Sequence, residues 1–320
     1  MALKVLIPQD VAKEGKDYLL QHGYEIKMGS NISVEQLIKD VEDCDAVLVR
    51  TAPMTEEVLR AGKKLKIVAR HGVGYDNVDV KVAQELGIWA TNAPLSNANS
   101  VAEHTIGLII AAARNIFRCG IEFRNGNFEI RNQLNGCDLE GKILGVIGVG
   151  KIGSLVAKKA TLGLGMKVIG YDPYITSAQI DPNIKLINDW EQVFKNADFI
   201  SLHMPATEKT KGIVGKKEFK MMKPTAYFIN CARGEVVNEH DLIEALKAKE
   251  IAGAALDVYE QEPPEKDNPL FAFDNVTLTP HNASLTKESA IRMALHAAME
   301  IHEVLSGNRP KWPVNNPKFK

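Results

Sequence analysis

Three polar residues in the second half of the chain each follow a short apolar segment. Arg233 comes after AYFINCA, and a guanidinium at that point can grip a carboxylate through two parallel hydrogen bonds. Glu262 lies in LDVYEQEPP and His281 in TLTPHNAS, where a carboxylate can orient an imidazole that donates or accepts a proton. Taken singly, Arg233 could be a surface ion-pair residue, and His281 a helix-capping or core histidine.

A glycine-rich segment between these residues and the N-terminus has the spacing of a dinucleotide-binding turn. In ILGVIGVGKIG, Gly148, Gly150 and Gly153 follow an apolar run and open a helical pattern. The first glycine permits a tight turn, the second lets the backbone reach a pyrophosphate, and the third allows close helix–strand packing. The alternative is an ordinary tight turn.

An acidic residue at the end of the next apolar run indicates which dinucleotide binds. Asp172 comes nineteen residues after Gly153, where its carboxylate can accept hydrogen bonds from both ribose hydroxyls. Asp172 also repels a 2′-phosphate, and no arginine follows it in YDPYITSA, so we expect NAD rather than NADP. A merely capping aspartate is the competing interpretation.

The elements that must position these residues alternate between short β-branched apolar runs and amphipathic stretches. This alternation is typical of βαβ units and predicts an α/β fold with parallel sheets buried on both faces. A first set of strands is expected at residues 4–7, 24–27, 46–49, 67–69 and 88–91. A second, larger set is expected at residues 143–147, 167–171, 199–202, 227–230, 253–257 and 276–278.

Two long helices complete the predicted elements. The first runs over residues 101–124, with Ser100 as its N-cap and Glu103 completing a capping box. Its apolar face of Ile106, Ile109, Ile110 and Ala113 is more extensive than a surface helix needs, which favours a homodimer contact, with burial inside the same chain as the alternative. The second covers residues 287–306 and ends at Gly307.

Composition excludes several classes of protein. The 320 residues are 45% hydrophobic and 25% charged, as in ordinary globular proteins, and suggest two domains. The net charge of −1 gives no field that would collect nucleic acid or an anionic membrane surface. No apolar stretch approaches the ~20 residues of a membrane span, and no signal peptide is apparent, so we expect a cytoplasmic protein.

Cysteine and histidine usage argues against a metal centre or a disulfide framework. The four cysteines, at positions 44, 119, 137 and 231, are far apart and form no CxxC motif, so we expect reduced thiols. None of the eight histidines forms a close ligand pair with a cysteine or carboxylate, so we expect no metal.

Several motifs taken together resemble one family over practically the full length. GVIGVGKIG, YDPY, NCARGEVV, LDVYEQEPP and TPHNAS occur in the order and spacing of the D-isomer-specific 2-hydroxyacid dehydrogenases, and RHGVGYDNVDV and NAPLSNANSVAEHT are similar to their other signature segments. The resemblance implies that Arg233 binds the substrate carboxylate, that His281 is the general acid/base, and that Glu262 pairs with the histidine. Hydride would pass between nicotinamide and C2 of the substrate.

The resemblance also implies further contacts. The amides of Val73 and Gly74 would hold the substrate carboxylate, as an anion nest can, and Asn97 would line the same cleft. The remaining residues implied to bind NAD are Lys151, Ile152, Met204, Pro205, Cys231, Ala232, Asp257 and Ala283. In this chain Asn282 and Ala283 stand where many members have an aliphatic residue and then glycine, and Phe128 stands where tryptophan is usual.

The family architecture implies two doubly wound domains. Residues 1–99 and 285–320 would form a smaller, flavodoxin-like substrate domain, and residues 100–284 a Rossmann NAD domain inserted into it. A homodimer or a dimer of dimers is expected.

The substrate is indicated by two arginines of the first segment. Arg50 and Arg70 follow neighbouring predicted strands and could accept a phosphate, as in members that act on 3-phosphoglycerate. Hydroxypyruvate, glyoxylate and other 2-oxo acids remain alternatives. Because the chain stops shortly after its last predicted helix, feedback control by serine through an added domain is not expected. An alternative of another class is a non-catalytic NAD-sensing protein that resembles the corepressor relatives of this family.

Overall fold

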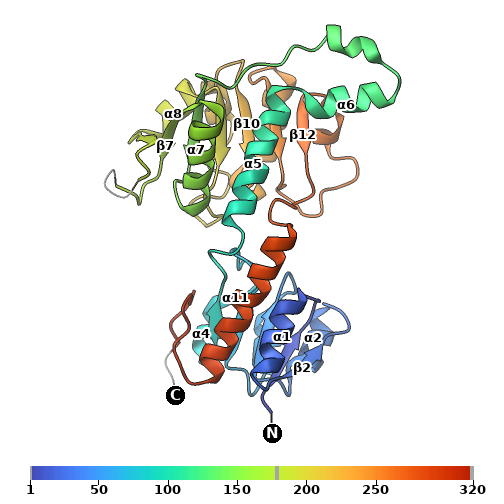
Figure 1. Cartoon of the computed structure of the whole chain (residues 1–320), viewed down its shortest axis with the longest axis vertical. Coiled ribbons are helices and arrows are strands. Elements are labelled where there is room, and N and C mark those ends of the chain that lie inside the picture. The colour runs from blue at the N-terminus through green and yellow to red at the C-terminus, as the bar shows by residue number, and fades with distance from the viewer. Residues whose placement is uncertain (1, 177–179, 318–320) are drawn as a thin grey trace. The chain divides into compact units, whose positions relative to one another are not determined.

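The computed structural model describes residues 2–176 and 180–317, which fold into two compact units (Figure 1). The first unit comprises Met1–Asn97 and Leu285–Lys320, and the second comprises Ala98–Ser284. The second unit is therefore inserted into the sequence of the first. The role assigned to each unit stays a prediction at this point.

The first unit is built on a parallel sheet of five strands in the order β2-β1-β3-β4-β5. This is the flavodoxin-like order, in which right-handed crossovers put helices on both faces. The predicted strands all form, with ends that shift by one residue at most. Their bounds are β1 Lys4–Ile7, β2 Glu25–Met28, β3 Ala46–Val49, β4 Ile67–Arg70 and β5 Trp89–Thr91.

Helices cover both faces of this sheet because alternate strand residues point to opposite sides. Leu6 and Val47 pack against α2 (Val34–Val41), α3 (Glu56–Ala61) and α4 (Val80–Leu86). Val5 and Leu48 pack instead against α1 (Lys13–Gln21) and the C-terminal α11 (Lys287–Leu305). The last helix thus belongs to the core of the first unit, although it follows the second unit in sequence.

The second unit contains a parallel sheet of seven strands in the order β12-β11-β10-β9-β6-β7-β8. Counted from β6, this is the Rossmann order, so the predicted α/β class is confirmed for both sheets. The short strand β8 is absent from the sequence prediction, because three residues with a lysine between two apolar positions carry little signal. The strands are β6 Ile143–Ile147, β7 Lys167–Tyr171, β8 Ile184–Leu186, β9 Phe199–Leu202, β10 Tyr227–Asn230, β11 Gly253–Leu256 and β12 Val276–Leu278.

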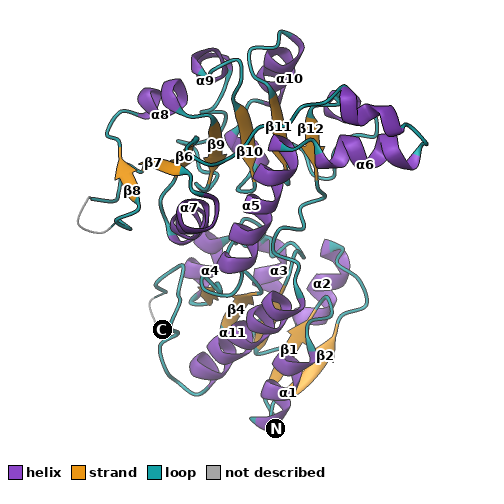
Figure 2. Ribbon diagram, turned by 45° about the horizontal axis from the view of Figure 1, so that its top comes forward, coloured by secondary structure: helices purple, strands orange, loops and turns teal. Residues whose placement is uncertain are grey.

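Two layers of helices enclose the larger sheet (Figure 2). One face is covered by α5 (Ala98–Ala113) and α7 (Lys151–Leu164). The other is covered by α8 (Trp190–Asn196), α9 (Lys216–Met221), α10 (Glu239–Lys247) and η3 (Pro269–Ala272). The remaining elements are α6 (Ile116–Arg124), η1 (Phe128–Asn132) and η2 (Gly234–Val236).

The helix predicted over residues 101–124 is two helices in the structure. The first begins at Ala98, so Ser100 lies inside it, buried, and is not its N-cap. Glu103 does not complete a capping box, because its carboxylate accepts a hydrogen bond from the Asn99 side chain at 2.7 Å. The break falls at Asn115, which adopts a left-handed φ of 53°, a conformation that asparagine tolerates better than most residues.

Two of the four residues of the apolar face predicted on α5 are buried within their own unit. Ile109 and Ala113 are completely buried and share a core cluster with Val156 and Ala160 of α7. Burial inside the same chain therefore accounts for these two residues, whereas Ile106 and Ile110 of the same face are half-buried, and a homodimer contact there stays a prediction. The apolar side chains that do remain exposed lie on the following helix, α6, of which no residue is buried.

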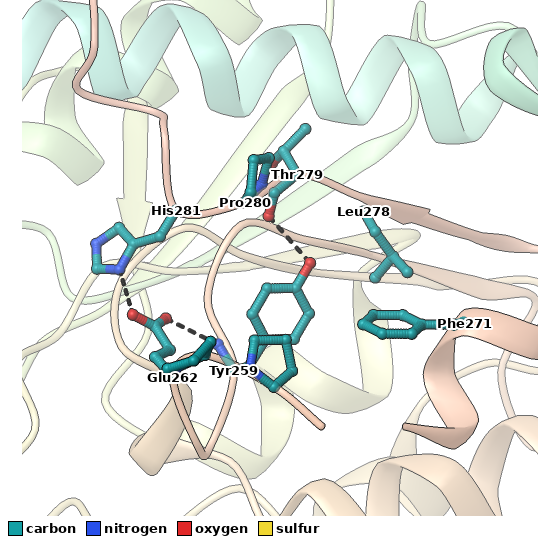
Figure 3. Close-up of a pocket in the computed structure, with 9 residues that line it drawn as sticks. Tyr259, Glu262, Phe271, Leu278, Thr279, Pro280 and His281 are labelled. Atoms are coloured by element: carbon teal, nitrogen blue, oxygen red, sulfur yellow. Dashed lines mark hydrogen bonds and ion pairs between the residues drawn. The ribbon is translucent and has the colours of Figure 1, made fainter. Parts of the chain in front are cut away.

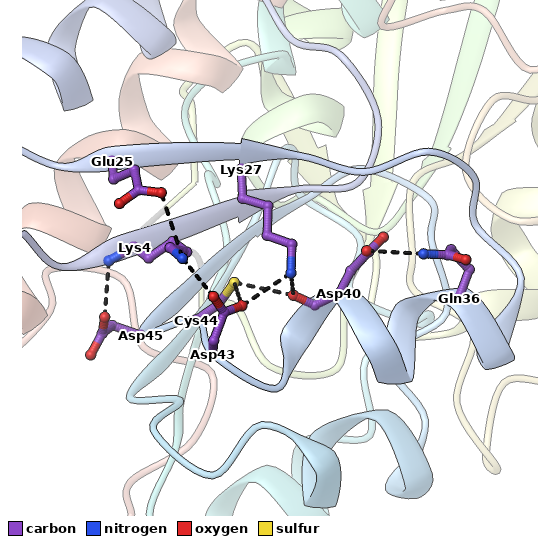
Figure 4. Close-up of polar contacts among 8 residues, drawn as sticks. All are labelled: Lys4, Glu25, Lys27, Gln36, Asp40, Asp43, Cys44 and Asp45. Atoms are coloured by element: carbon purple, nitrogen blue, oxygen red, sulfur yellow. Dashed lines mark hydrogen bonds and ion pairs between the residues drawn. The ribbon is translucent and has the colours of Figure 1, made fainter.

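A network of ionic contacts lies beside strands β1 and β2 of the first unit (Figure 4). Lys4 Nζ lies 2.5 Å from Asp43 Oδ2, and Lys27 Nζ lies 3.0 Å from Asp43 Oδ1. These contacts tie the edge strand β2 and strand β1 to the turn before β3. Burial raises the pKa of the neighbouring Cys44 to about 12, so its thiol stays protonated.

Across residues 2–176 and 180–317, no helix combines the length and apolar character needed to cross a bilayer. In the same part of the chain, no three His, Cys, Asp or Glu side chains are grouped to hold a metal ion.

Candidate active site

The carboxyl ends of six strands in the second unit carry most of the predicted site residues. All these strands are parallel, so their carboxyl ends meet at one edge of the sheet, with the topological switch point between β6 and β9. Along this edge Asp172 follows β7, the glycine turn follows β6, Met204 and Pro205 follow β9, Cys231 to Arg233 follow β10, Asp257 follows β11, and His281 follows β12. Strand order therefore sets one direction, from Asp172 to His281, for an extended ligand.

His281 and Glu262 are directly paired (Figure 3). Nδ1 of His281 lies 2.6 Å from Oε2 of Glu262, and Oε1 of Glu262 accepts a hydrogen bond from the Tyr259 N–H at 3.1 Å. The hydrogen bond and the charge of Glu262 raise the pKa of His281, against the opposing effect of burial. Burial alone would raise the pKa of Glu262, but the contacts with His281, the Tyr259 N–H and the charge of Arg233 together outweigh burial, and the pKa is lowered. The pair therefore favours an imidazolium beside a carboxylate.

Arg233 lies in a turn fixed by its neighbours after β10. The Asn230 side chain donates to the Arg233 carbonyl at 2.9 Å and accepts from the Ala232 N–H at 2.9 Å. Gly234 allows this turn to pack against the Tyr259 carbonyl, because any side-chain carbon at position 234 would collide with it. The charge of Arg233 lowers the pKa of both His281 and Glu262, so the three predicted catalytic residues act on one another electrostatically.

A cavity of about 540 Å³ adjoins the histidine–glutamate pair. Figure 3 shows Tyr259, Phe271 and Leu278 along one part of its wall, with His281 and Glu262 along another. The wall is completed by Pro263, Pro264, Thr279 and Pro280. A proton-exchanging pair at the margin of a mainly apolar cavity is a suitable arrangement for acid–base chemistry, because low polarity strengthens its electrostatics.

The glycine turn has the geometry that a dinucleotide requires. Gly148 has a φ of +90°, and a side chain there would collide with the backbone of His203 and Met204. Gly153 packs against the Gly148 carbonyl, where a side chain would also collide. Gly150, in contrast, faces open space at the N-terminus of α7, so its backbone is accessible to a phosphate and to the helix dipole. Lys151 is exposed and Ile152 half-buried beside it.

Asp172 is already bound to the glycine turn. Oδ2 accepts from the Val149 N–H at 2.9 Å, and Oδ1 accepts from the Tyr174 N–H at 2.9 Å. A carboxylate offers about four acceptor positions, so two remain for ribose hydroxyls. The residue thus orients the turn and keeps its capacity to bind a ribose, and this observation together with Gly150 shows that the turn fits NAD.

The other predicted cofactor residues line the same edge. Met204 is half-buried beside Gly148, Pro205 is exposed, and Ala232 is half-buried. Burial raises the pKa of Cys231 to about 12. Asp257 is completely buried and accepts hydrogen bonds from the N–H groups of Asn282 and Ala283, each at 2.9 Å. Its observed contacts are therefore with the turn that carries His281.

The predicted carboxylate-binding residues belong to the first unit. Gly72, with a φ of +134°, opens the turn after β4, and the Asn92 side chain donates to the Val73 carbonyl at 2.8 Å. Within the described residues, no acceptor is found for the N–H groups of Val73 and Gly74, as an anion nest requires. Among the described residues, no hydrogen-bond partner is found for the buried Oδ1 atom of Asn97.

Arg50 and Arg70 flank a buried histidine that the sequence prediction does not include. Burial, together with the charges of Arg70 and Arg50, lowers the pKa of His71 to about 4. Arg50 donates to the Asp10 carbonyl at 3.0 Å, and Arg70 donates to the His71 carbonyl. His71 stands next to Arg70 in RHGVG, yet only the fold reveals that it is buried and that the charge of Arg50 also acts on it.

Comparisons with known proteins agree with this geometry. The model of the D-isomer specific 2-hydroxyacid dehydrogenase NAD binding domain matches residues 106–283. The chain is 41% identical to D-3-phosphoglycerate dehydrogenase of Methanocaldococcus jannaschii over 99% of its own length, but it spans only 60% of that relative. It is 39% identical to hydroxypyruvate reductase of Thermotoga maritima, covering 90% of this chain and 94% of the relative. The structure of D-lactate dehydrogenase with NAD+ from Lactobacillus jensenii superposes with a TM-score of 0.81 at 29% identity, over 98% of this chain and 100% of that one.

Proposed function

Since the chain belongs to the D-isomer specific 2-hydroxyacid dehydrogenase family, we propose that it interconverts a D-2-hydroxy acid and its 2-oxo acid with NAD. The observation that carries this proposal is the 2.6 Å contact between His281 and Glu262. It lies on the same sheet edge as a glycine turn and an aspartate suited to a dinucleotide.

Each residue of the pair has a distinct task in this reaction. Bound NAD supplies the hydride acceptor or donor for C2 of the substrate. Because Nδ1 of His281 is held by Glu262, Nε2 is the atom that exchanges a proton with the substrate oxygen. Glu262 stabilises the imidazolium form, which is the form that donates during reduction. Arg233 binds the substrate carboxylate and favours negative charge on the neighbouring oxygen.

The residues proposed to hold NAD lie in two groups. Gly150, Lys151 and Ile152 would present backbone N–H groups to the pyrophosphate at the N-terminus of α7. Asp172 would accept from the adenosine ribose and disfavour a 2′-phosphate, which gives preference for NAD over NADP. The nicotinamide half would lie along Met204, Pro205, Cys231, Ala232, Asp257 and Ala283.

A phosphorylated substrate of the 3-phosphoglycerate type is the first choice. In support, the charges of Arg50 and Arg70 both lower the pKa of His71, so both guanidinium groups lie near it. All three residues belong to the unit that contains the Val73–Gly74 amides. Two arginines offer the planar donors that a phosphate prefers. The name of the Methanocaldococcus relative points in the same direction.

Reduction of hydroxypyruvate or glyoxylate is the second candidate. The observation in its favour is that the chain is 39% identical to the hydroxypyruvate reductase of Thermotoga maritima over 90% of its own residues. These substrates lack the phosphate, so the two arginines would then serve the carboxylate or the fold.

We propose that the working form is a homodimer joined through α6. The apolar patch consists of side chains with exposed fractions between 48% and 62%, namely Ile116, Phe117, Ile121, Phe123 and Phe128. A nine-residue helix with no buried residue gains little stability from its own unit. Docking on a second copy would cover this patch and the groove beside Phe117 and Ile121.

The cytoplasm is the proposed location of the enzyme. All four cysteines are free thiols in the structure, and Cys44 and Cys231 are buried. Reducing compartments maintain thiols in this state.

One assay tests the reaction and separates its alternatives. NADH is incubated with 3-phosphohydroxypyruvate, hydroxypyruvate, glyoxylate and 2-oxoisocaproate, and its consumption is followed. We expect turnover with at least one acid, and a kcat at least ~10²-fold lower in His281→Ala, which should still bind NADH. Absence of turnover with every acid, in a protein that binds NADH, would refute the dehydrogenase and support the NAD-sensing alternative.

A further inference from the structure

The turn that carries His281 is held from behind by a second histidine, on α5. His104 Nε2 lies 3.1 Å from the hydroxyl oxygen of Thr279 and 3.6 Å from Oδ1 of Asp257. The Thr279 hydroxyl in turn donates to Asp257 Oδ1 at 2.6 Å. The three side chains therefore form a continuous chain from α5, through the end of β12, to the loop after β11.

The direction of the hydrogen bonds among these three side chains can be deduced. A threonine hydroxyl has one proton, and the proton of Thr279 goes to the completely buried carboxylate of Asp257. The Thr279 oxygen must then accept from His104, so Nε2 of His104 carries a proton. Donation runs from His104 to Thr279 and from Thr279 to Asp257.

Both ends of the His281 turn are held by the hydrogen-bonded side chains of His104, Thr279 and Asp257. The Thr279 carbonyl accepts from the Tyr259 hydroxyl at 3.0 Å, which Figure 3 shows, and from the His281 N–H at 3.1 Å. Beyond His281, Asp257 accepts the N–H groups of Asn282 and Ala283. His281 itself has a φ of +50°, a left-handed conformation that is uncommon for a residue with a side chain, and the hydrogen bonds on both sides of it hold the backbone there.

We propose that His104 is a positioning residue, which fixes the backbone turn of His281 through Thr279 and Asp257 and so holds the imidazole against Glu262. The side chain of His104, on α5, makes its polar contacts with Thr279 and Asp257 and not with His281 or Glu262. Its influence on catalysis is therefore indirect.

The pKa of His281 depends on the charges around it, so a change in the position of its turn can be measured as a change in that pKa. Glu262 raises the pKa of His281 through a hydrogen bond and its charge, Asp257 raises it further by charge, and Arg233 lowers it. A turn that loosens changes the Glu262 contact first, and that contact is the largest cause of the raised pKa. Loss of the His104 donor should therefore lower the pH at which His281 titrates.

The test follows the imidazole directly, so it does not require turnover. Histidine-labelled protein is titrated by NMR in the wild type and in His104→Phe, His104→Gln and Thr279→Val, with the His281 signal assigned by its loss in His281→Ala. Phenylalanine removes the donor, whereas glutamine can place an N–H near the position of Nε2. We expect the His281 midpoint to fall in His104→Phe and Thr279→Val, and to stay near the wild-type value in His104→Gln.

A second readout and a control complete the experiment. In His104→Phe, kcat should fall ~5-fold or more with little change in the KM for NADH, and His104→Gln should recover most of it. His240→Gln, which changes an exposed histidine of α10, should leave the His281 titration unchanged. If His281 titrates alike in the wild type, His104→Phe and Thr279→Val, the positioning role is wrong. The kcat readout rests on the proposed function, whereas the titration does not, so failure of one can be told from failure of the other.

Discussion

The Nδ1 atom of His281 lies 2.6 Å from Oε2 of Glu262, although the two residues come from the loops after different strands. The second oxygen of Glu262 is held by the Tyr259 N–H, so the carboxylate cannot turn without losing one contact. This fixes which imidazole nitrogen faces Glu262 and which remains for the reaction.

Replacement of Glu262 by glutamine should change the pH dependence of reduction. Glu262 raises the pKa of His281, and reduction needs the protonated imidazole, so activity should persist above the ordinary pKa of histidine and fall as pH rises further. In Glu262→Gln this fall should begin at lower pH, and kcat should be ~10-fold lower than that of the wild type. The pH profile of kcat/KM measures the change, and an identical profile would remove Glu262 from its role.

Replacement of Arg233 by lysine should impair the use of substrate more than the binding of NADH. Lysine keeps the charge but cannot bind a carboxylate through two parallel donors. We expect kcat/KM for the 2-oxo acid to fall ~10²-fold, with NADH affinity nearly unchanged in a fluorescence titration. Full activity in Arg233→Lys would show that only charge matters at this position.

Replacement of Asp172 by asparagine should reduce the preference for NAD over NADP. The substitution keeps one acceptor for the Val149 or Tyr174 N–H and removes the charge that repels a 2′-phosphate. The ratio of kcat/KM for the two cofactors should fall ~10-fold or more. Melting temperatures are compared in parallel, because loss of stability alone would lower both activities and leave their ratio unchanged.

Aspartate at Ile121 or Phe123 should dissociate the proposed dimer. Both side chains are at least 60% exposed on α6, so a charge there costs the single chain little but would be buried in the contact. Sedimentation should show a dissociation constant at least ~10-fold higher in either variant. Leu162→Asp on α7, where the leucine is equally exposed, is the matched control and should leave the mass unchanged. A wild-type protein that sediments as a single chain would contradict the dimer.

Replacement of Asp43 by asparagine should cause a small, pH-dependent loss of stability. Hydrogen bonds from Lys4 and Lys27 hold the pKa of Asp43 well below its usual range. A lowered pKa means that the stabilisation is present above the pKa of the unfolded chain and is lost as pH falls through that of the folded protein. Because the group is about half exposed, we expect a decrease of ~0.5–1 kcal/mol in the free energy of unfolding near pH 7. Urea titrations should show the two proteins converging in acid.

The sequence by itself determined the α/β class and nearly all the strands. Strands buried on both faces are largely apolar, so segments such as AVLV and GAAL can be recognised from the local sequence. The glycine turn is equally local, because the φ of Gly148 and the close packing of Gly153 each demand a residue without a side chain. The sequence did not predict strand β8, because it is only three residues long, or the helix break at Asn115, because it depends on the φ of a single residue.

Only the tertiary structure decided which polar side chains meet. His104 and Thr279 are 175 residues apart, and no pattern in either segment announces their contact. The contact exists because β10, β11 and β12 are neighbours at one sheet edge, with α5 packed across them. The same holds for His71, which is buried next to Ala290 of α11 and senses the charges of two arginines at the ends of different strands. Contacts between distant residues are fixed by strand order and by which faces are covered, and these are properties of the folded chain as a whole.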